Sequence, residues 1–106
     1  MLKVTTDSIT GREIEETLGV VVANAVRARH VGRDILATLK NLAGGEIGAY
    51  QQLLVESREQ AITRVEADAV ALGADAIVAL RISTSSIAQG ASEVLVYGTA
   101  VKLRAS

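Results

Sequence analysis

The sequence predicts an α+β fold in which a four-stranded, mainly antiparallel sheet is combined with two helices in the order β-β-α-α-β-β. Three observations lead to this prediction. Apolar residues recur at alternate positions from Ile14 onward, which is the two-residue period of a strand. At Val31 the period changes to the three- and four-residue steps of a helix, and helical sequence continues to Leu72. A continuous apolar run then begins at Ala76, as is typical of a buried strand.

The first two predicted elements are strands. A short one covers residues 2–5 and is followed by the turn residues of segment 7–11. A long one covers residues 14–28, and Gly19 within it predicts a β-bulge, because glycine in a strand often marks the extra residue of a bulge.

Two helices follow, and a glycine-rich segment separates them. The first covers residues 31–42 and is ended by Gly44 and Gly45, since glycine adopts the left-handed cap conformation without steric cost. The second opens around Ala49 and runs without Pro or Gly to residue 72. At about 1.5 Å per residue it is expected to be more than ~30 Å long.

Two further strands complete the predicted sheet. Residues 76–86 form the first and residues 93–103 the second, and the polar stretch Ser83–Ser92, centred on Gly90, is expected to form the turn between them. Two strands joined by a glycine-containing loop predict a β-hairpin.

Composition limits the classes of function. The chain has 106 residues, enough for one domain spanning residues 1–106, and its net charge is −1, which does not favour nucleic-acid binding. The absence of Cys excludes disulfides, thiolate catalysis and thiolate metal sites. We find neither a signal peptide nor a run of about 18 apolar residues that could cross a membrane, so we expect a cytoplasmic protein with no membrane partner.

The glycines of NLAGGEIGAYQQLL, residues 41–54, could form a phosphate-binding loop or a hinge. A phosphate-binding P-loop follows a strand, opens a helix, and carries Lys and a hydroxyl residue directly after its glycines. Here a predicted helix precedes the glycines, and no such Lys follows them. The context therefore favours a hinge between two helices that binds no ligand.

His30 is the only histidine in the chain, and Asp34 follows it by four residues. On a helix this spacing places both side chains on one face, where they could hold a divalent metal ion. The alternative is a partly exposed histidine near a helix start, and two ligands are too few for a tight site. Further ligands would have to come from elsewhere in the chain or from a second subunit.

The predicted strands have two apolar faces, which predicts self-association. We expect the helices to cover the face with the larger side chains, so that the face with the smaller ones needs another copy of the chain to cover it. The larger set is Leu18, Val20, Val22, Val78, Leu80, Ile82, Leu95, Tyr97, Val101 and Leu103; the smaller set is Val21, Ala23, Ala25, Ile77, Ala79, Val94, Val96 and Ala100.

Short motifs along nearly the whole chain carry a family resemblance. The order GAY at residues 48–50, LGADAI at residues 72–77 and YGTAV at residues 97–101 is similar to that of the YbjQ-like family of small bacterial and archaeal proteins. Arg33–Asp34 and Gly44–Gly45 fit the same pattern. The resemblance implies an α+β fold assembled as a ring-like homopentamer, and the family carries a heavy-metal-binding label.

Two hypotheses about function follow. The protein is either a metal- or small-ligand-binding homo-oligomer, or a structural or partner-binding oligomer without metal. We do not expect an enzyme, because no set of residues suggests catalysis. With no Cys and Met1 as the only Met, a metal site would rely on His30 and carboxylates, which suits zinc, nickel or manganese better than softer metals.

Overall fold

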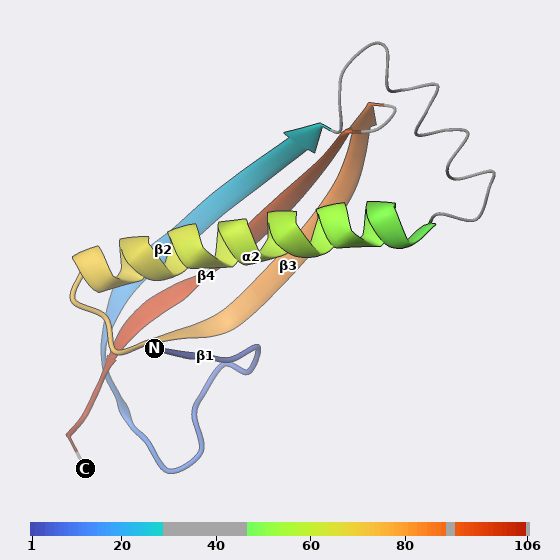
Figure 1. Ribbon diagram of the computed structural model, residues 1–106. Helices are drawn as coiled ribbons and strands as arrows, with labels where there is room; N and C mark the ends of the chain where they lie inside the picture. The colour runs from blue at the N-terminus through green and yellow to red at the C-terminus, as the bar shows by residue number, and fades with distance from the viewer. Residues whose placement is uncertain (29–46, 89–90, 106) are drawn as a thin grey trace.

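The computed structural model describes residues 1–28, 47–88 and 91–105 (Figure 1). Its four strands form one sheet in the order β1-β3-β4-β2, and one long helix lies across a face of that sheet. The predicted α+β class and the four strands are therefore confirmed. The elements are β1 (Leu2–Lys3), β2 (Ile14–Ala28), α2 (Ile47–Ala71), β3 (Ala76–Ala88) and β4 (Ala91–Leu103).

Only one of the two predicted helices falls in the described part of the chain. α2 is continuous, as predicted, and starts two residues earlier than expected. The predicted first helix, residues 31–42, lies outside the described residues, as do Gly44 and Gly45. Gly48 was expected to belong to the hinge, but it lies in the first turn of α2, so that part of the prediction is wrong.

The sheet is mixed. β2 pairs with β4 and β3 pairs with β4 in antiparallel fashion, whereas the two residues of β1 pair with β3 in parallel. The β3–β4 hairpin is confirmed, but its strands are longer than predicted. Ser83 to Ala88 belong to β3, and the polar residues Ser86 and Ser92 pair directly with each other. The hydroxyl residues taken as a turn therefore extend the hairpin, because pairing depends on the backbone and not on side-chain polarity.

The bulge predicted at Gly19 is present. The β2–β4 register shifts between Thr17 and Gly19, and Gly19 has a φ of 131°, a value that side chains larger than hydrogen rarely allow. An extra residue reverses the alternation of side chains beyond it. Leu18 therefore packs against the same core as Val21, while Val20 turns to the opposite face.

A second bulge, in β3, was not predicted. The β3–β4 register shifts between Val78 and Arg81, and Ala79 has a φ of 53°, in the left-handed region. The bulge presses on Gly98 of β4. A Cβ at position 98 would lie 2.7 Å from Ile77 Cγ2, 3.2 Å from the Val78 carbonyl oxygen and 3.3 Å from Leu80 Cα. Glycine at position 98 is therefore what allows the two strands to approach here.

The main core lies between α2 and the sheet face with the smaller side chains, which is the reverse of our expectation. Alanine on the helix brings its backbone close to the sheet, and small residues on β2 and β4 accept that approach. The helix packs mainly over β2 and β4 and much less over β3. The buried residues of this core are Ala61, Val65 and Ala69 on α2 and Val21, Ala25, Ile77, Leu80, Val94, Val96 and Ala100 on the sheet.

A smaller core covers part of the opposite face. There Val4 and Ile9, from the segment between β1 and β2, contribute apolar side chains, with Ile14 of β2 beside them. They pack against four buried residues, Ala76, Val78, Val101 and Leu103. These side chains cover the end of the sheet that holds the C-terminal half of β4, and none of the described residues covers the other end of this face.

Candidate functional site

The part of the sheet face opposite α2 that no described residue covers, which we call the open face, carries several exposed apolar side chains. Val20, Val22 and Val26 point from β2 onto this face and are 73%, 52% and 54% exposed. Tyr97 of β4 is 41% exposed beside them, and Leu95 is half-buried. All of these side chains except Val26 belong to the larger set that was predicted to lie under the helices.

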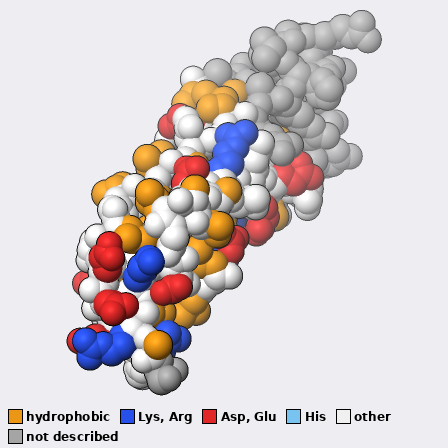
Figure 2. Space-filling view, turned by 90° about the vertical axis from the view of Figure 1, so that its left-hand side faces the viewer, with side chains coloured by type: hydrophobic (Ala, Val, Ile, Leu, Met, Phe, Trp, Pro, Cys, Tyr) orange, Lys and Arg blue, Asp and Glu red, His pale blue; other side chains and the backbone are white. Residues whose placement is uncertain are grey.

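Strand register explains why they form one patch. Val22 is paired with Tyr97, Val20 with Thr99, and residue 24 with Leu95 across the antiparallel β2–β4 ladder. Side chains directly opposite each other in such a ladder lie on the same face of the sheet at contact distance. Figure 2 views the flank of the molecule that lies on the left of Figure 1, and hydrophobic side chains run along much of it between groups of charged ones.

The patch becomes polar toward β3. Arg81 is paired with Tyr97 and Ser83 with Leu95, so both lie on the open face. Arg81 Nη1 donates hydrogen bonds to the carbonyl oxygens of Thr5, at 2.8 Å, and Leu80, at 3.0 Å. The arginine thus fixes the end of the N-terminal segment against β3, and the hydroxyl residues beyond it are exposed.

The predicted metal ligands His30 and Asp34 both lie outside the described residues. Within residues 1–28, 47–88 and 91–105, no three side chains of the His, Asp, Glu or Cys type come together in a way that could hold a metal ion. An imidazole and a carboxylate fit a divalent ion of the zinc or nickel type, whereas a chain without thiols does not fit mercury or cadmium.

A shallow hollow of about 190 Å³ lies between the residues that precede β2 and those that follow β4. Arg104 forms an ion pair with Glu13 at 2.8 Å, and Arg12 Nη2 donates to the Arg104 carbonyl oxygen at 3.2 Å. Arg104 and Glu13 are each 63% exposed. Their charges are thus paired in solvent, and the arrangement ties the start of β2 to the end of β4.

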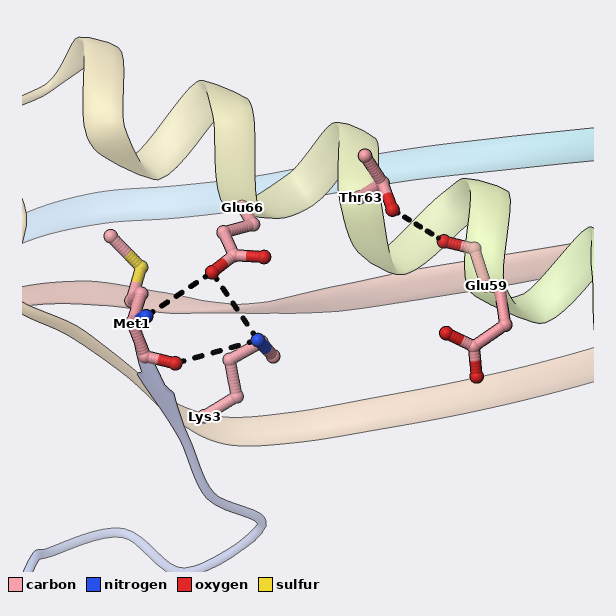
Figure 3. A network of polar contacts seen from close by, with 5 residues as sticks. All are labelled: Met1, Lys3, Glu59, Thr63 and Glu66. Atoms are coloured by element: carbon pink, nitrogen blue, oxygen red, sulfur yellow. Dashed lines mark hydrogen bonds and ion pairs between the residues drawn. The ribbon is translucent and has the colours of Figure 1, made fainter.

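The N-terminal ammonium and Lys3 converge on one carboxylate of α2 (Figure 3). Both nitrogens lie 3.3 Å from Glu66 Oε1. The hydrogen bond from the Met1 ammonium, followed by the hydrogen bond and charge of Lys3, lowers the pKa of Glu66 below its usual value. Farther along α2, Thr63 Oγ1 donates to the Glu59 carbonyl oxygen at 2.9 Å, a bond within the helix. The Glu66 contacts attach β1 to the helix.

The motif LGADAI at residues 72–77 has a structural role. Gly73, with a φ of 82°, follows α2, and its N–H bonds the Val70 carbonyl at 2.9 Å, which closes the helix end. The Asp75 carboxylate then accepts a hydrogen bond from the Leu103 N–H at 2.9 Å. Together with Gly98 in YGTAV, these residues explain two of the motifs as determinants of the fold. A glycine directly after a long helix is a cap signal, so the sequence predicted the cap at Gly73, and this is confirmed. Sequence reasoning did not identify the roles of Asp75 and Gly98.

Comparison with known proteins places this fold in a family. A family model described as "Putative heavy-metal-binding", YbjQ_1, matches residues 1–104. The chain belongs to the YbjQ-like family. A curated relative from Photobacterium profundum, UPF0145 protein PBPRB0184, is 62% identical over 103 residues, which cover 97% of this chain and all of the relative. A UPF0145 protein from Fervidobacterium nodosum is 55% identical over 104 residues, covering 98% of this chain and 96% of the relative.

A solved structure supports the fold of this YbjQ-like chain. A protein of unknown function from Pediococcus pentosaceus, assigned to the DUF74 family, superposes with a TM-score of 0.63 at 20% identity and covers 98% of both chains. At that identity the similarity concerns the fold alone. The sequence resemblance to the YbjQ-like family is confirmed, and the relatives' names add no activity. No helix in the described part of the chain is long and apolar enough to cross a membrane.

Proposed function

We propose that this YbjQ-like protein functions as a homo-oligomer, a ring-like pentamer, in which the open face of the sheet is buried between subunits. The observation that supports this proposal most directly is the exposure of Val20, Val22, Val26 and Tyr97, four large apolar residues on adjacent strands, at 41% to 73%. Contiguous apolar patches of this kind usually mark interfaces, whereas single exposed apolar residues do not. The number five comes from the family resemblance.

The shape of the chain also supports assembly. The molecule is elongated, with extents of 54 × 22 × 16 Å along its principal axes, and one helix lies over one face of the sheet. In so thin a molecule, much of the sheet lies near the surface. Burying about 800 Å² of largely apolar surface per subunit at ~25 cal/mol/Å² gives a gross driving force on the order of 20 kcal/mol before the costs of association. An assembly of this kind acts as a scaffold or binding protein, and we assign it no catalytic role.

Native mass spectrometry of the untagged protein at micromolar concentration tests the proposal. We expect a species of five 11.1 kDa chains and little monomer. A dimer or hexamer would overturn the pentamer but leave self-association standing. A stable folded monomer at that concentration would overturn the homo-oligomer itself. Cell fractionation tests the compartment, which we propose to be the cytoplasm.

Metal binding is the second candidate, and the family's description favours it. His30 and Asp34 would hold a zinc, nickel or manganese ion, with further carboxylates completing the ligand set, because two ligands are too few for a tight site. Calorimetric titration of zinc and nickel into wild type and into His30→Ala is the test. We expect weak binding that the substitution removes. Binding of equal strength in both proteins would exclude His30 as a ligand.

A further inference from the structure

Residues 2–12, which we call the strap, cover the smaller core but are themselves mostly in solvent. Lys3, Val4 and Ile9 are half-buried, and the other residues of the strap are exposed. β1, at its start, pairs with β3 over two residues. Segments with few buried apolar contacts belong to the part of a fold that opens most easily. Beneath Val4 and Ile9 lie the buried side chains of Ala76, Val78, Val101 and Leu103.

The bulge in β3 provides the strap with two adjacent hydrogen-bond donors. The Ala79 N–H bonds the Thr6 carbonyl oxygen at 2.8 Å, and the Leu80 N–H bonds the Val4 carbonyl oxygen at 3.0 Å. In a regular strand, consecutive N–H groups point to opposite sides, so a bulge is needed to direct both toward one neighbour. The left-handed conformation of Ala79 and the binding of the strap therefore depend on each other.

Arg81 holds the same segment from the side of the open face. Its Nη1 donates to the Thr5 carbonyl oxygen at 2.8 Å and to the Leu80 carbonyl oxygen at 3.0 Å, so one guanidinium joins the strap to the bulge. Hydrogen bonds from a charged donor are stronger than those between neutral groups. Because Arg81 is paired with Tyr97 of β4, it lies where the covered end of the sheet face meets the open face.

We propose that the strap and the β3 bulge open together as one unit while α2 and the β2–β4 ladder stay folded, and that Arg81 holds this unit closed. The backbone bonds and the arginine contact break together, because all of them join the strap to residues 77–81. The ion pair of Lys3 with Glu66 breaks at small cost, since both side chains are partly solvated. Opening uncovers the smaller core and extends the apolar open face to the other end of the sheet. This conformational device belongs to the single chain and goes beyond the proposed oligomer.

Hydrogen exchange followed by mass spectrometry, on the intact protein under native conditions, tests this inference. After correction for intrinsic rates, the hydrogen-bonded amides of residues 2–8 and 78–81 should exchange at one common rate. That rate should be about tenfold or more above the rate of residues 57–65 in the middle of α2, which exchange only when the chain unfolds further. A common rate in two segments far apart in the sequence is the signature of one opening event.

Two arginine variants test the role of Arg81. Arg81→Gln should speed exchange in residues 2–8, whose own sequence is unchanged, by about tenfold or more, because the closed state loses a charged hydrogen bond. Arg64→Gln is the matched control. Arg64 Nη1 also donates to a backbone carbonyl, that of Asn24 at 2.8 Å, but on β2, at the opposite edge of the sheet from β1. It should leave exchange in residues 2–8 unchanged. Both arginines are exposed, so both variants should fold.

A third variant acts in the opposite direction. Ala79→Gly removes the unfavourable backbone conformation of the closed state, so it should slow exchange in residues 2–8, by up to about fivefold. Slower exchange at the strap after a change in β3 links the two segments directly.

Three results would overturn the inference. Equal protection of the strap and of α2 would mean that the strap opens only with the whole chain. Protection that declines gradually along residues 2–12, with residues 78–81 as protected as α2, would mean that the chain end frays without the bulge. Equal effects of Arg81→Gln and Arg64→Gln would show that Arg81 does not hold the strap closed. None of these readouts depends on the number of copies in the assembly, so the proposed oligomer is tested separately.

Discussion

At the scale of single residues, the most demanding position is Gly98. The bulge in β3 brings Ile77, the Val78 carbonyl and Leu80 against it, and two of the three nearest atoms belong to backbone, which cannot rotate away. The tightness explains why a glycine stands in the middle of a strand, where it otherwise costs stability.

Replacing Gly98 with Ala should lower the free energy of unfolding by about 1–3 kcal/mol, the usual cost of forcing a methyl group into a packed site. Urea unfolding followed by circular dichroism measures the change. Thr99→Ala, at the next position of the same strand, is the control and should cost less. Equal stability of wild type and Gly98→Ala would mean that the strands do not approach as closely as the distances indicate.

Ala79 offers the opposite test, because its φ of 53° is unfavourable for any residue with a side chain. The left-handed conformation costs a residue with a side chain roughly 1–2 kcal/mol, and glycine avoids this cost. Glycine in turn costs about 0.5–1 kcal/mol, because it has more conformational freedom to lose on folding. Ala79→Gly should therefore raise the free energy of unfolding by up to about 1 kcal/mol. Ala79→Val should lower it, since a β-branched residue tolerates this conformation least. A loss of stability in Ala79→Gly would contradict the strain.

At the scale of elements, the contact between the N-terminal segment and α2 depends on pH. The lowered pKa of Glu66 means that its ion pairs with Met1 and Lys3 stabilise the fold above the ordinary Glu pKa of about 4.3. This stabilisation is lost as the pH falls through the lower, folded-state pKa, because protonation removes the charge.

The melting temperature of wild type should therefore exceed that of Glu66→Gln at pH 7, and the difference should shrink to zero in acid. High salt should reduce it as well, because the pair is partly exposed. Glu59→Gln is the control, since the Glu59 carboxylate points away from both cations in Figure 3. A difference that stays constant from pH 7 down to pH 3 would show that the ion pairs do not contribute.

The elements themselves could be predicted from sequence, because α2, β2 and the hairpin have long, uninterrupted periods. The assignment of faces could not be predicted, since a bulge changes which side chains share a face. Gly19 gave a signal for the first bulge, but its effect on Leu18 and Val20 was not followed through. Ala79 gives no signal for the second, since alanine normally avoids positive φ.

The candidate site was predicted in part. Val20, Val22 and Tyr97 were recognised as one apolar set, but were placed inside because large side chains usually fill a core. The small residues at the contact positions of α2 reverse this placement. Ala61 and Ala69 meet the sheet, and a helix with alanine at its contact positions fits closely only against small partners. That His30 and Asp34 bind a metal ion stays a prediction from their spacing in the sequence.

At the scale of the whole molecule, the described residues form two layers, and we propose that association with other copies covers the open face of the sheet. The family resemblance predicts a ring, and the contiguous apolar residues of the open face are the surface that a neighbouring copy would cover in it.

Substitutions at two adjacent residues of β2 distinguish an effect on assembly from an effect on folding. Val22 is 52% exposed on the open face, whereas Ala23 faces α2 and packs against the main core. Val22→Asp should therefore convert the oligomer to a folded monomer, because the charge would have to be buried at the subunit contact. Ala23→Asp should lower the free energy of unfolding of each chain by about 2 kcal/mol or more, since the charge lies under the helix.

Light scattering and circular dichroism, recorded on the same samples, distinguish the two variants. Val22→Asp should lose mass per particle and keep its helical signal, and Ala23→Asp should lose the helical signal on mild heating. If no folded monomer exists on its own, Val22→Asp will unfold as well, but its loss of structure will then depend on protein concentration, as it must when association and folding are coupled. A Val22→Asp protein with the mass and concentration dependence of wild type would show that the open face takes no part in assembly.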